Sequence, residues 1–294
     1  MRNYIKKLIV KNYTIDSYYG GFGNNLQQLA LGVMYANLYK KNFLPKKHNL
    51  LNSFSIINNS FSANVFRKYR FVSRFFYFEN NSEKFTNNLE TDIPLKNQDS
   101  KYYVENFNSV FQETLSPRMN FIKNIDIGKN TLVIHIRSGD IFVKSEDKTI
   151  SGHQYYIQNP LVYYNMLIEN YENTILVSST PLNNPVIDIL KNNNKVEVSS
   201  GSLEDDFNLL LNAKNLATSG VGTFAVAAAL SSKKIKNLHY SNLFFKHHLN
   251  PTMVKNVNHH KYRFNGYLNI GEKWTGDEGQ VQKMLSPEIE VVRI

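Results

Sequence analysis

A histidine, an arginine and an aspartate fall within a few positions of one another, at His135, Arg137 and Asp140. A guanidinium is a planar fork of donors that suits phosphate oxygens, and an imidazole or a carboxylate can hold or move a proton. His135 and Arg137 are two residues apart, so they would share one face of a strand. Gly139 allows the backbone to turn, so that Asp140 could pair with Arg137. We therefore take Arg137, His135 and Asp140 as candidate catalytic residues.

The residues around this group predict the elements that position it. An apolar, mostly β-branched run at 132–136 predicts a short buried strand. Helical and strand-like segments alternate after it, which favours an α/β fold with a parallel sheet, where ligands bind beyond the carboxyl ends of the strands. The predicted elements are a helix at 163–171, a strand at 174–178, a helix at 186–190, a strand at 196–198, a capped helix at 202–212, a strand at 216–218, a helix at 225–230 and a strand at 235–240.

A second candidate site lies near the N-terminus, where glycines occupy three of the four positions 20–23. A predicted strand at 4–10 precedes them and a predicted helix at 26–39 follows. Glycines let a ligand approach the backbone, and a helix start offers N–H groups, so this loop could hold an anion. Its spacing is neither the dinucleotide fingerprint nor a P-loop, and an ordinary tight turn is the alternative. The candidate binding residues here are Gly21, Gly23 and Asn24.

Composition narrows the classes of partner. The chain has 294 residues, enough for two domains, and a formal net charge of +10. Such a charge suits phosphorylated substrates, nucleic acid or an anionic membrane face, although a solvated basic surface is the simpler interpretation. The absence of cysteine excludes disulfides and thiolate metal sites. No run reaches the ~18 apolar residues of a membrane span, and no signal peptide is visible. We expect a cytoplasmic protein, with peripheral contact to the inner membrane face left open.

One segment, residues 65–78, alternates basic and aromatic side chains. Such interleaving can stack on nucleic acid bases and neutralise phosphates, or contact a membrane surface. No RNA-binding fold signature accompanies it. We therefore favour an amphipathic element with a basic outer face, and we predict no nucleic acid partner.

Three short segments carry a family resemblance: GGFGNN at 20–25, HIRSGD at 135–140 and SGVGTF at 219–224. With Gln27 and Gln28 after the first and an acidic stretch at 204–206 before the third, they resemble the fucosyltransferase superfamily, most closely its α1,2-fucosyltransferases. The resemblance extends in order over about residues 15–235, and the His-x-Arg strand end is its most specific part.

The resemblance implies a GT-B architecture, which is two Rossmann-like domains with a cleft between them. We expect an N-terminal, acceptor-side domain at 1–126 and a C-terminal nucleotide-sugar-binding domain with an extension at 127–294. The implied activity is an inverting glycosyltransferase, without metal or cofactor, that moves fucose from GDP-fucose to a hydroxyl of a glycan acceptor. Arg137 would contact the donor pyrophosphate. The other implied donor-binding residues are Gly222, Thr223 and Phe224 for phosphate, and Asp205 or Asp206 for the nucleoside.

The sequence departs from the family pattern at three places. Many relatives have a second arginine where this chain has Ser138, a serine where it has Gly222, and an aromatic pair where it has Ala225 and Val226. These departures leave open a different nucleotide sugar as donor. They also leave open a protein of the same fold that binds a nucleotide or glycan without catalysis.

Some chemical roles stay unassigned by sequence. The candidates for a base that activates the acceptor hydroxyl are Asp16, Asp140, Glu146 and Asp147. Adjacent histidines on a strand point to opposite faces, so we expect no metal site at the two pairs 247–248 and 259–260. Trp274 stands in a polar segment, and it is expected either to stack on a sugar from an exposed position or simply to pack.

Overall fold

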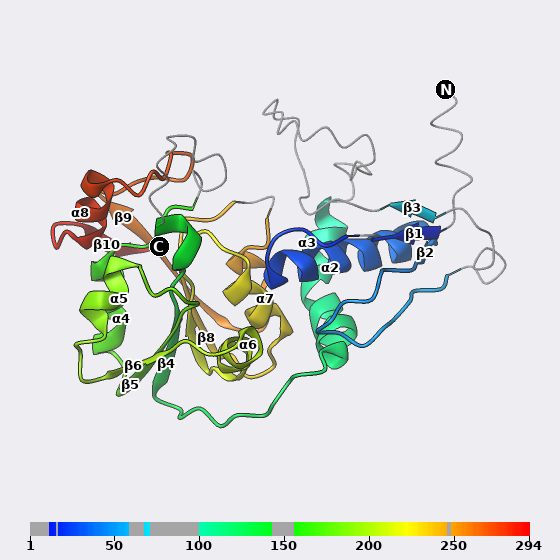
Figure 1. The fold of residues 1–294 in the computed structure, drawn as a ribbon, viewed down its shortest axis with the longest axis horizontal. Helices are drawn as coiled ribbons and strands as arrows, with labels where there is room; N and C mark the ends of the chain where they lie inside the picture. The colour runs from blue at the N-terminus through cyan, green and yellow to red at the C-terminus, as the bar shows by residue number, and fades with distance from the viewer. Residues whose placement is uncertain (1–11, 16, 59–67, 71–99, 143–155, 246–247) are drawn as a thin grey trace. The chain divides into compact units, whose positions relative to one another are not determined.

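The computed structural model describes residues 12–15, 17–58, 68–70, 100–142, 156–245 and 248–294 (Figure 1). The chain divides into two compact units, residues 1–121 and 122–294. The sequence-based boundary was placed at 126/127, so the division lies slightly earlier in the chain.

Unit 1 contains a parallel three-stranded sheet of order β2-β1-β3. Of the 18 residues of its long helix α2, 13 are buried. Gly32 of this helix lies against the ring of Phe43, where a Cβ would come 2.3 Å from the nearest ring carbon. Its elements are β1 (Asn12–Thr14), α2 (Phe22–Tyr39), β2 (Asn42–Phe43), β3 (Lys68–Arg70), α3 (Ser100–Ser109), the π-helix η3 (Val110–Leu115) and the 3₁₀ turn η4 (Ser116–Arg118).

Two sequence predictions for unit 1 fall wholly or partly outside the described residues. The strand predicted at 4–10 lies outside them. Of the basic, aromatic segment 65–78, the structure describes only β3, which pairs with β1.

Unit 2 is built on a seven-stranded sheet of order β10-β9-β8-β7-β4-β5-β6. All neighbours are parallel except β10, which pairs antiparallel with β9. Its elements are β4 (Thr131–His135), η5 (Gly139–Phe142), α4 (Leu161–Glu169), β5 (Asn173–Val177), α5 (Pro185–Leu190), β6 (Val196–Ser199), α6 (Leu203–Asn212), β7 (Asn215–Ala217), α7 (Phe224–Ser231), β8 (Asn237–Ser241), η6 (Pro251–Met253), β9 (Asn258–Asn265), α8 (Glu278–Leu285) and β10 (Glu290–Arg293). The α/β prediction is confirmed for this unit.

The strand order of unit 2 fixes where a ligand would bind. Chain order runs outward from β4 to β5 and β6, then returns across the sheet to β7, β8 and β9. This order is compatible with a Rossmann-like fold, in which ligands bind beyond the carboxyl ends of the strands where the direction reverses. That point lies between β4 and β7.

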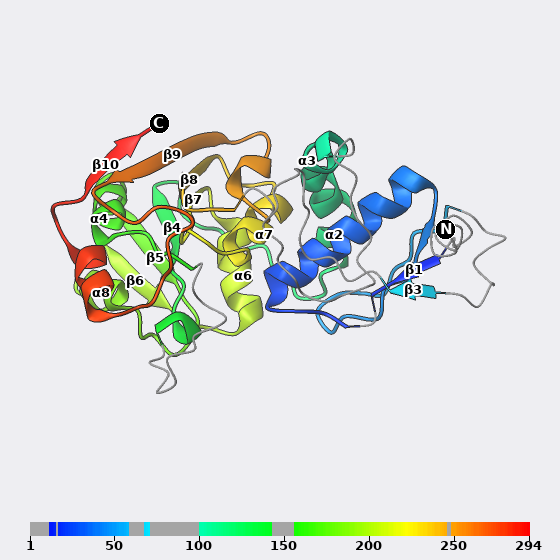
Figure 2. The ribbon, with the colours of Figure 1, turned by 90° about the horizontal axis from the view of Figure 1, so that it is seen from above.

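Helices cover both faces of the sheet. Figures 1 and 2 show α4, α5 and α8 on one face and α6 with α7 on the other. Every residue of β4 is buried, as expected for a central strand between two helical layers. The alanine-rich helix α7 is buried from Ala225 to Ser231, because small side chains allow close packing on the sheet. None of the described helices is long and apolar enough to cross a bilayer.

Candidate functional site

His135 links the end of β4 to the loop after β7. Its Nδ1 lies 3.1 Å from the Oγ of Ser219, and its ring centroid lies 5.5 Å from that of Phe224, the first residue of α7. Burial, with a smaller contribution from the charge of Arg137, lowers the pKa of His135 to about 3. The imidazole is therefore neutral near pH 7, and its contacts give it a positioning role between β4 and the loop.

The loop 218–223 follows β7 and takes a shape that requires glycine. Gly220 has φ +84°, and a Cβ there would lie 3.0 Å from the carbonyl oxygen of Ile157. Asn159, which is fully buried, donates to the carbonyl of Thr218 at 2.9 Å and accepts from the Oγ of Ser241 at 2.6 Å. One asparagine thus holds the ends of β7 and β8 in place.

Two glycines with similar positive φ angles allow the effect of backbone strain to be distinguished from that of crowding. Gly266 has φ +78° with nothing within 4 Å of its Cβ position, whereas Gly220 has close neighbours. We expect Gly266→Ala to lower the free energy of unfolding by about 1–2 kcal/mol, the cost of a left-handed non-glycine residue. Gly220→Ala should cost about 2–4 kcal/mol, because crowding adds to that strain. Urea denaturation of both variants measures the difference, and equal losses would show that the loop is not packed as described.

The start of α7 is suited to bind an anion. The side chain of its N-cap residue Thr223 makes no capping bond, and the first turn contains no acidic residue. A helix N-terminus carries a partial positive charge and N–H groups that point outward. By contrast, α6 is capped by Ser202 and has three acids in its first turn. Of the two helix starts on this face, α7 is therefore the one without a side-chain cap or an acid in its first turn.

Arg137 follows β4, two residues beyond its end, so the strand alternation expected to place it beside His135 stops before it. Its guanidinium carbon lies 3.9 Å from the ring centroid of Tyr156. Gln158 donates to the carbonyl of Tyr156 at 2.8 Å and forms an isolated β-bridge with Gly220. The segment that carries Tyr156 therefore also borders the glycine loop. Arg137 and this loop both follow the carboxyl ends of neighbouring strands, β4 and β7.

Ser138 has a structural role, at the position where the fucosyltransferases that the sequence resembles often have a second arginine. It is buried, and its Oγ accepts the N–H groups of Asn183 at 2.8 Å and Asn184 at 3.1 Å. Its single proton can go to the carbonyl of Pro181 at 2.8 Å or to the side chain of Asn183 at 2.9 Å. Ser138 thus fastens the loop after β4 to the loop after β5, a function that sequence reasoning missed.

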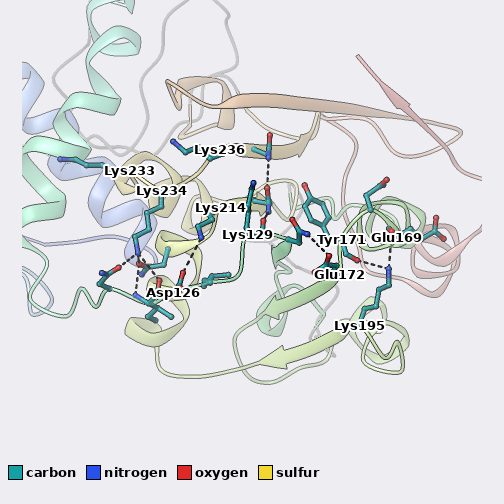
Figure 3. Close-up of a pocket in the computed structure, with 18 residues that line it drawn as sticks. Asp126, Lys129, Glu169, Tyr171, Glu172, Lys195, Lys214, Lys233, Lys234 and Lys236 are labelled. Atoms are coloured by element: carbon teal, nitrogen blue, oxygen red, sulfur yellow. Dashed lines mark hydrogen bonds and ion pairs between the residues drawn. The ribbon is translucent and has the colours of Figure 1, made fainter.

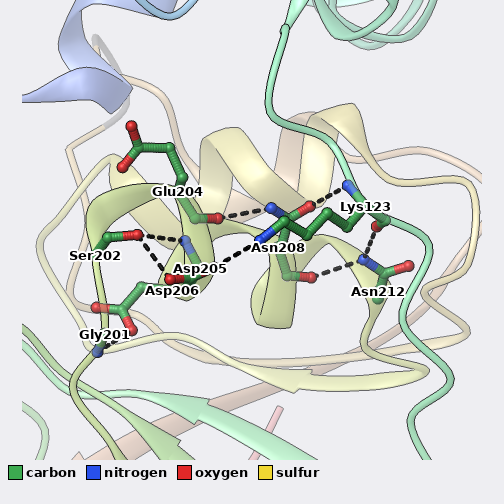
Figure 4. Close-up of polar contacts among 8 residues, drawn as sticks. All are labelled: Lys123, Gly201, Ser202, Glu204, Asp205, Asp206, Asn208 and Asn212. Carbon is green, nitrogen blue, oxygen red and sulfur yellow. Dashed lines mark hydrogen bonds and ion pairs between the residues drawn. The ribbon is translucent and has the colours of Figure 1, made fainter.

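The two acids proposed for the nucleoside stabilise the first turn of α6 (Figure 4). Ser202 caps the N–H of Asp205 at 3.1 Å and donates to its carboxylate at 2.9 Å, which confirms the capping pattern. The bond from Ser202 and the nearby Lys123 lower the pKa of Asp205. Asp206 accepts the N–H of Gly201 at 3.0 Å, and its burial raises its pKa.

An aromatic contact joins this turn to the rest of the site. Phe207, the next residue after Asp206, has its ring centroid 5.5 Å from that of Phe224. Phe224 in turn packs against His135. The ends of β4 and β7 are therefore in direct contact at the site, while the acids of α6 connect to it through one ring.

The glycine loop of unit 1 is held by its own asparagine. Gly20 has φ +70°, and Asn25 donates to the carbonyls of Tyr19 and Gly20 at 3.0 and 3.2 Å. His48 accepts the N–H of Leu50 through Nδ1, so its Nε2 carries the proton that it shares with Asn25 at 3.2 Å. Of the predicted binding residues, Gly21 is the exposed N-cap of α2, and Gly23 and Asn24 lie in its first turn.

Trp274 packs in the core, which is one of the two alternatives that the sequence left open. The other alternative, stacking on a sugar from an exposed position, is wrong, because the residue is only 1% exposed. Its Nε1 donates to the carbonyl of Ile141 at 3.2 Å, and its ring packs edge-on against Phe142. Trp274 is therefore part of the core that anchors the loop after β4, because its large apolar surface outweighs the polar residues beside it in sequence.

Several predicted residues lie beyond the structural description. The side chain of Asp140 is outside it, as are residues Asp16, Glu146, Asp147 and His247. His259 and His260 bond to the carbonyl of Val254 and the side chain of Asn237. Among the described residues, no three histidines, cysteines or acids gather in a way that could hold a metal ion.

Comparison with known proteins adds no relative. No family model, no curated protein and no solved structure matches this chain.

Proposed function

We propose that this chain is an inverting, metal-independent glycosyltransferase that uses a nucleotide-sugar donor and a glycan acceptor. GDP-fucose is the first candidate donor, on the resemblance of the three sequence segments. We also propose the GT-B architecture, with two Rossmann-like domains.

The observation that carries the proposal is the convergence at the switch point of the unit 2 sheet. His135 at the end of β4 lies 3.1 Å from Ser219 at the end of β7, beside the uncapped start of α7. The Arg137 guanidinium lies against Tyr156, whose segment borders the same loop. A fixed cation, a tight glycine turn and a helix start together suit a diphosphate.

The chemistry requires little more from the protein. The acceptor oxygen attacks the anomeric carbon as the bond from that carbon to the diphosphate oxygen breaks, and the configuration inverts. Negative charge gathers on the leaving nucleoside diphosphate, where Arg137 and the N–H groups at the start of α7 would stabilise it. The hydroxyl proton passes to a base or to water. His135 does not suit that role, since its pKa of about 3 leaves it a very weak base.

A ligand screen tests the donor site directly. We expect GDP and GDP-fucose, with EDTA present, to raise the melting temperature of the full chain, because a ligand that binds only the folded state stabilises it. The gain is about 2.7 kcal/mol at a concentration 100 times the Kd. UDP and CDP are the comparison ligands. A shift with UDP or CDP alone would change the donor, and no shift with any nucleotide would contradict the proposal.

The buried Ser138 favours a second candidate, a protein that binds a nucleotide without catalysis. Its Oγ is enclosed by the loop after β5, so the second cation of the family pattern is absent at this position. Multiple-turnover release of the nucleoside diphosphate from a sugar nucleotide in the presence of glycan acceptors separates the two. Turnover excludes the binding protein, whereas a melting shift without turnover favours it.

A further inference from the structure

A large groove lies at the opposite end of the unit 2 sheet from the candidate site. It has a volume of about 1430 Å³ and is lined by residues that precede the strands or follow the helices (Figure 3). Its lining includes Asn130, just before β4, and Asn215 and Asn237, the first residues of β7 and β8. The groove therefore follows the amino edge of the sheet, and nothing in the proposed transfer reaction uses it.

A lysine stands just before several strands along the amino edge of the sheet. Lys236, Lys214 and Lys195 stand directly before β8, β7 and β6, and Lys129 stands two residues before β4. Neighbouring strands are about 4.8 Å apart, so these positions form a row along the edge. In Figure 3, Lys195 lies at one end, with Lys129 and Lys214 between it and Lys234. The sheet order gives the same sequence of positions.

A series of hydrogen bonds between asparagine side chains joins the strand starts next to these lysines. Asn237 donates to the side chain of Asn215 at 2.8 Å, and Asn258, the first residue of β9, donates to Asn237 at 3.1 Å. Asn215 also donates to the carbonyls of Lys129 and Thr131, both at 3.0 Å. The backbone that carries Lys129, Lys214 and Lys236 is thus fixed by side-chain bonds.

Two lysines of the groove have a structural use. Lys195 donates to the carbonyl of Tyr171 at 3.0 Å, just past the end of α4. Lys234 donates to the carbonyl of Ile125 at 3.2 Å and to the side chain of Asn212, the last residue of α6, at 2.6 Å. Cations at a helix C-terminus offset the negative end of the helix dipole. The presence of Lys195 and Lys234 therefore has a structural explanation.

Of the four remaining lysines of the lining, Lys233 does not stand at the start of a strand, and the other three have no such structural use. The ammonium groups of Lys129 and Lys236 have no hydrogen bond or ion pair within the described parts of the chain, and both residues are exposed. Lys214 lies 3.6 Å from Asp126, whose side chain is 95% exposed. An exposed pair of this kind is weak and is readily exchanged for another anion. These three lysines, which we call the edge lysines, are available to a ligand.

The groove also contains carboxylates, and these limit what the ligand can be. Six lysines and three acids (Asp126, Glu169 and Glu172) line it, which leaves a net charge of +3 from the lining. Glu172 stands between the edge lysines and Lys195 along the row, because it precedes Asn173, the first residue of β5. A strand of nucleic acid, with a charge on every unit, would meet repulsion there. A chain whose charges are separated by neutral units would not.

We propose that the edge lysines bind an acidic polysaccharide in which acidic sugars alternate with neutral ones. Lysine ammoniums would pair with the acidic groups, and the carboxylates and amides would accept or donate to the hydroxyls of the neutral sugars. Nucleic acid fits less well, since among the described residues of the lining Tyr171 is the only aromatic one and none is an arginine. A membrane fits less well because the surface is hollowed and three carboxylates stand among its lysines. The proposal stands whether or not the protein is a transferase.

The test is a fluorescence-anisotropy titration of the full chain with labelled hyaluronan oligosaccharide, which carries a carboxylate on alternate sugars. The probe should bind, and the triple variant Lys129→Gln/Lys214→Gln/Lys236→Gln should bind it at least about tenfold more weakly, since three charge-assisted contacts are lost. Raising the salt concentration should weaken binding of the wild type more steeply than that of the variant.

A matched variant and four comparison ligands decide the outcome. Lys191→Gln/Lys273→Gln/Lys283→Gln removes the same charge from exposed positions outside the groove and should change binding less than about twofold. Neutral dextran should not bind, and oligogalacturonate, charged on every sugar, should bind more weakly. Binding that both triple variants weaken equally, or no binding of hyaluronan, overturns the proposal. Tighter binding of oligouridylate or of phosphatidylserine vesicles, lost in the edge-lysine variant, replaces the polysaccharide with that partner.

Discussion

Replacing Arg137 with alanine is expected to lower kcat/KM for the sugar nucleotide by about 10²–10³, the effect of removing one preorganised group that stabilises charge in the transition state. Folding should be nearly unaffected, because the side chain is only half-buried and its aromatic contact with Tyr156 contributes about 0.5–1 kcal/mol. Steady-state kinetics together with calorimetric titration of the nucleoside diphosphate measure both parts of the effect.

Two further variants serve as comparisons for Arg137→Ala. Arg137→Lys keeps the charge and loses the fork, so it should retain more activity than Arg137→Ala. Arg263→Ala removes an exposed arginine from β9 and should leave kinetics unchanged. Unaltered donor binding and turnover in Arg137→Ala would remove the assignment of the diphosphate site.

Replacing Trp274 with alanine should cost about 3–5 kcal/mol of unfolding free energy, the range for large buried aromatic side chains. The ring is 1% exposed and its N–H bonds to the carbonyl of Ile141, so the variant leaves both a cavity and an unsatisfied acceptor. Circular dichroism in urea is the suitable measurement, because the chain has a single tryptophan and its fluorescence disappears with the substitution.

Trp274→Phe and Leu203→Ala serve as comparisons. The phenylalanine keeps most of the ring and loses the hydrogen bond, so it should fall between the wild type and the alanine variant. Leu203 is 40% exposed at the start of α6, and its truncation should cost less than about 1 kcal/mol. A loss at Trp274→Ala no larger than that at Leu203→Ala would contradict the buried position.

The local pattern of apolar residues was sufficient to predict the alternating strands and helices of unit 2. The run 132–136 predicted β4 within a residue, and the apolar spacing after it placed α4, β5, α5, β6, α6, β7, α7 and β8 close to their observed bounds. These elements are short, regular and bounded by turn residues, which is where periodicity is informative. The apolar run at 132–136 also predicted that His135 lies at the carboxyl end of a buried strand, where the structure has it.

Other features depend on contacts that no local pattern encodes. Beyond residue 244 the sequence predicted no elements, yet β9, α8 and β10 complete the sheet and one of its faces. Ser138 and Asn159 look like ordinary loop residues, and only the folded loops show that each joins two strand ends. The segment that carries Tyr156 was not recognised for the same reason.

The edge lysines left no distinctive sequence signal. A lysine followed by an asparagine occurs nine times in the sequence, and only the fold shows that the dipeptides at 129–130, 214–215 and 236–237 stand at or just before the starts of neighbouring parallel strands. Along the chain these dipeptides look like scattered surface charge, and they were interpreted in that way. They come together only because parallel strands bring their starts to one edge.

The strand order of unit 2 also has a consequence for how the protein folds. The first strand of its sheet, β4, lies in the middle, and the contact between Thr131 and Asn215 that joins it to β7 closes 84 residues of chain. Closing so long a loop costs entropy before the pairing compensates for it, which slows folding. We therefore expect the two strand ends that meet at His135 and Ser219 to come together late. Partly folded molecules with β4 and β5 already paired would still lack the candidate site.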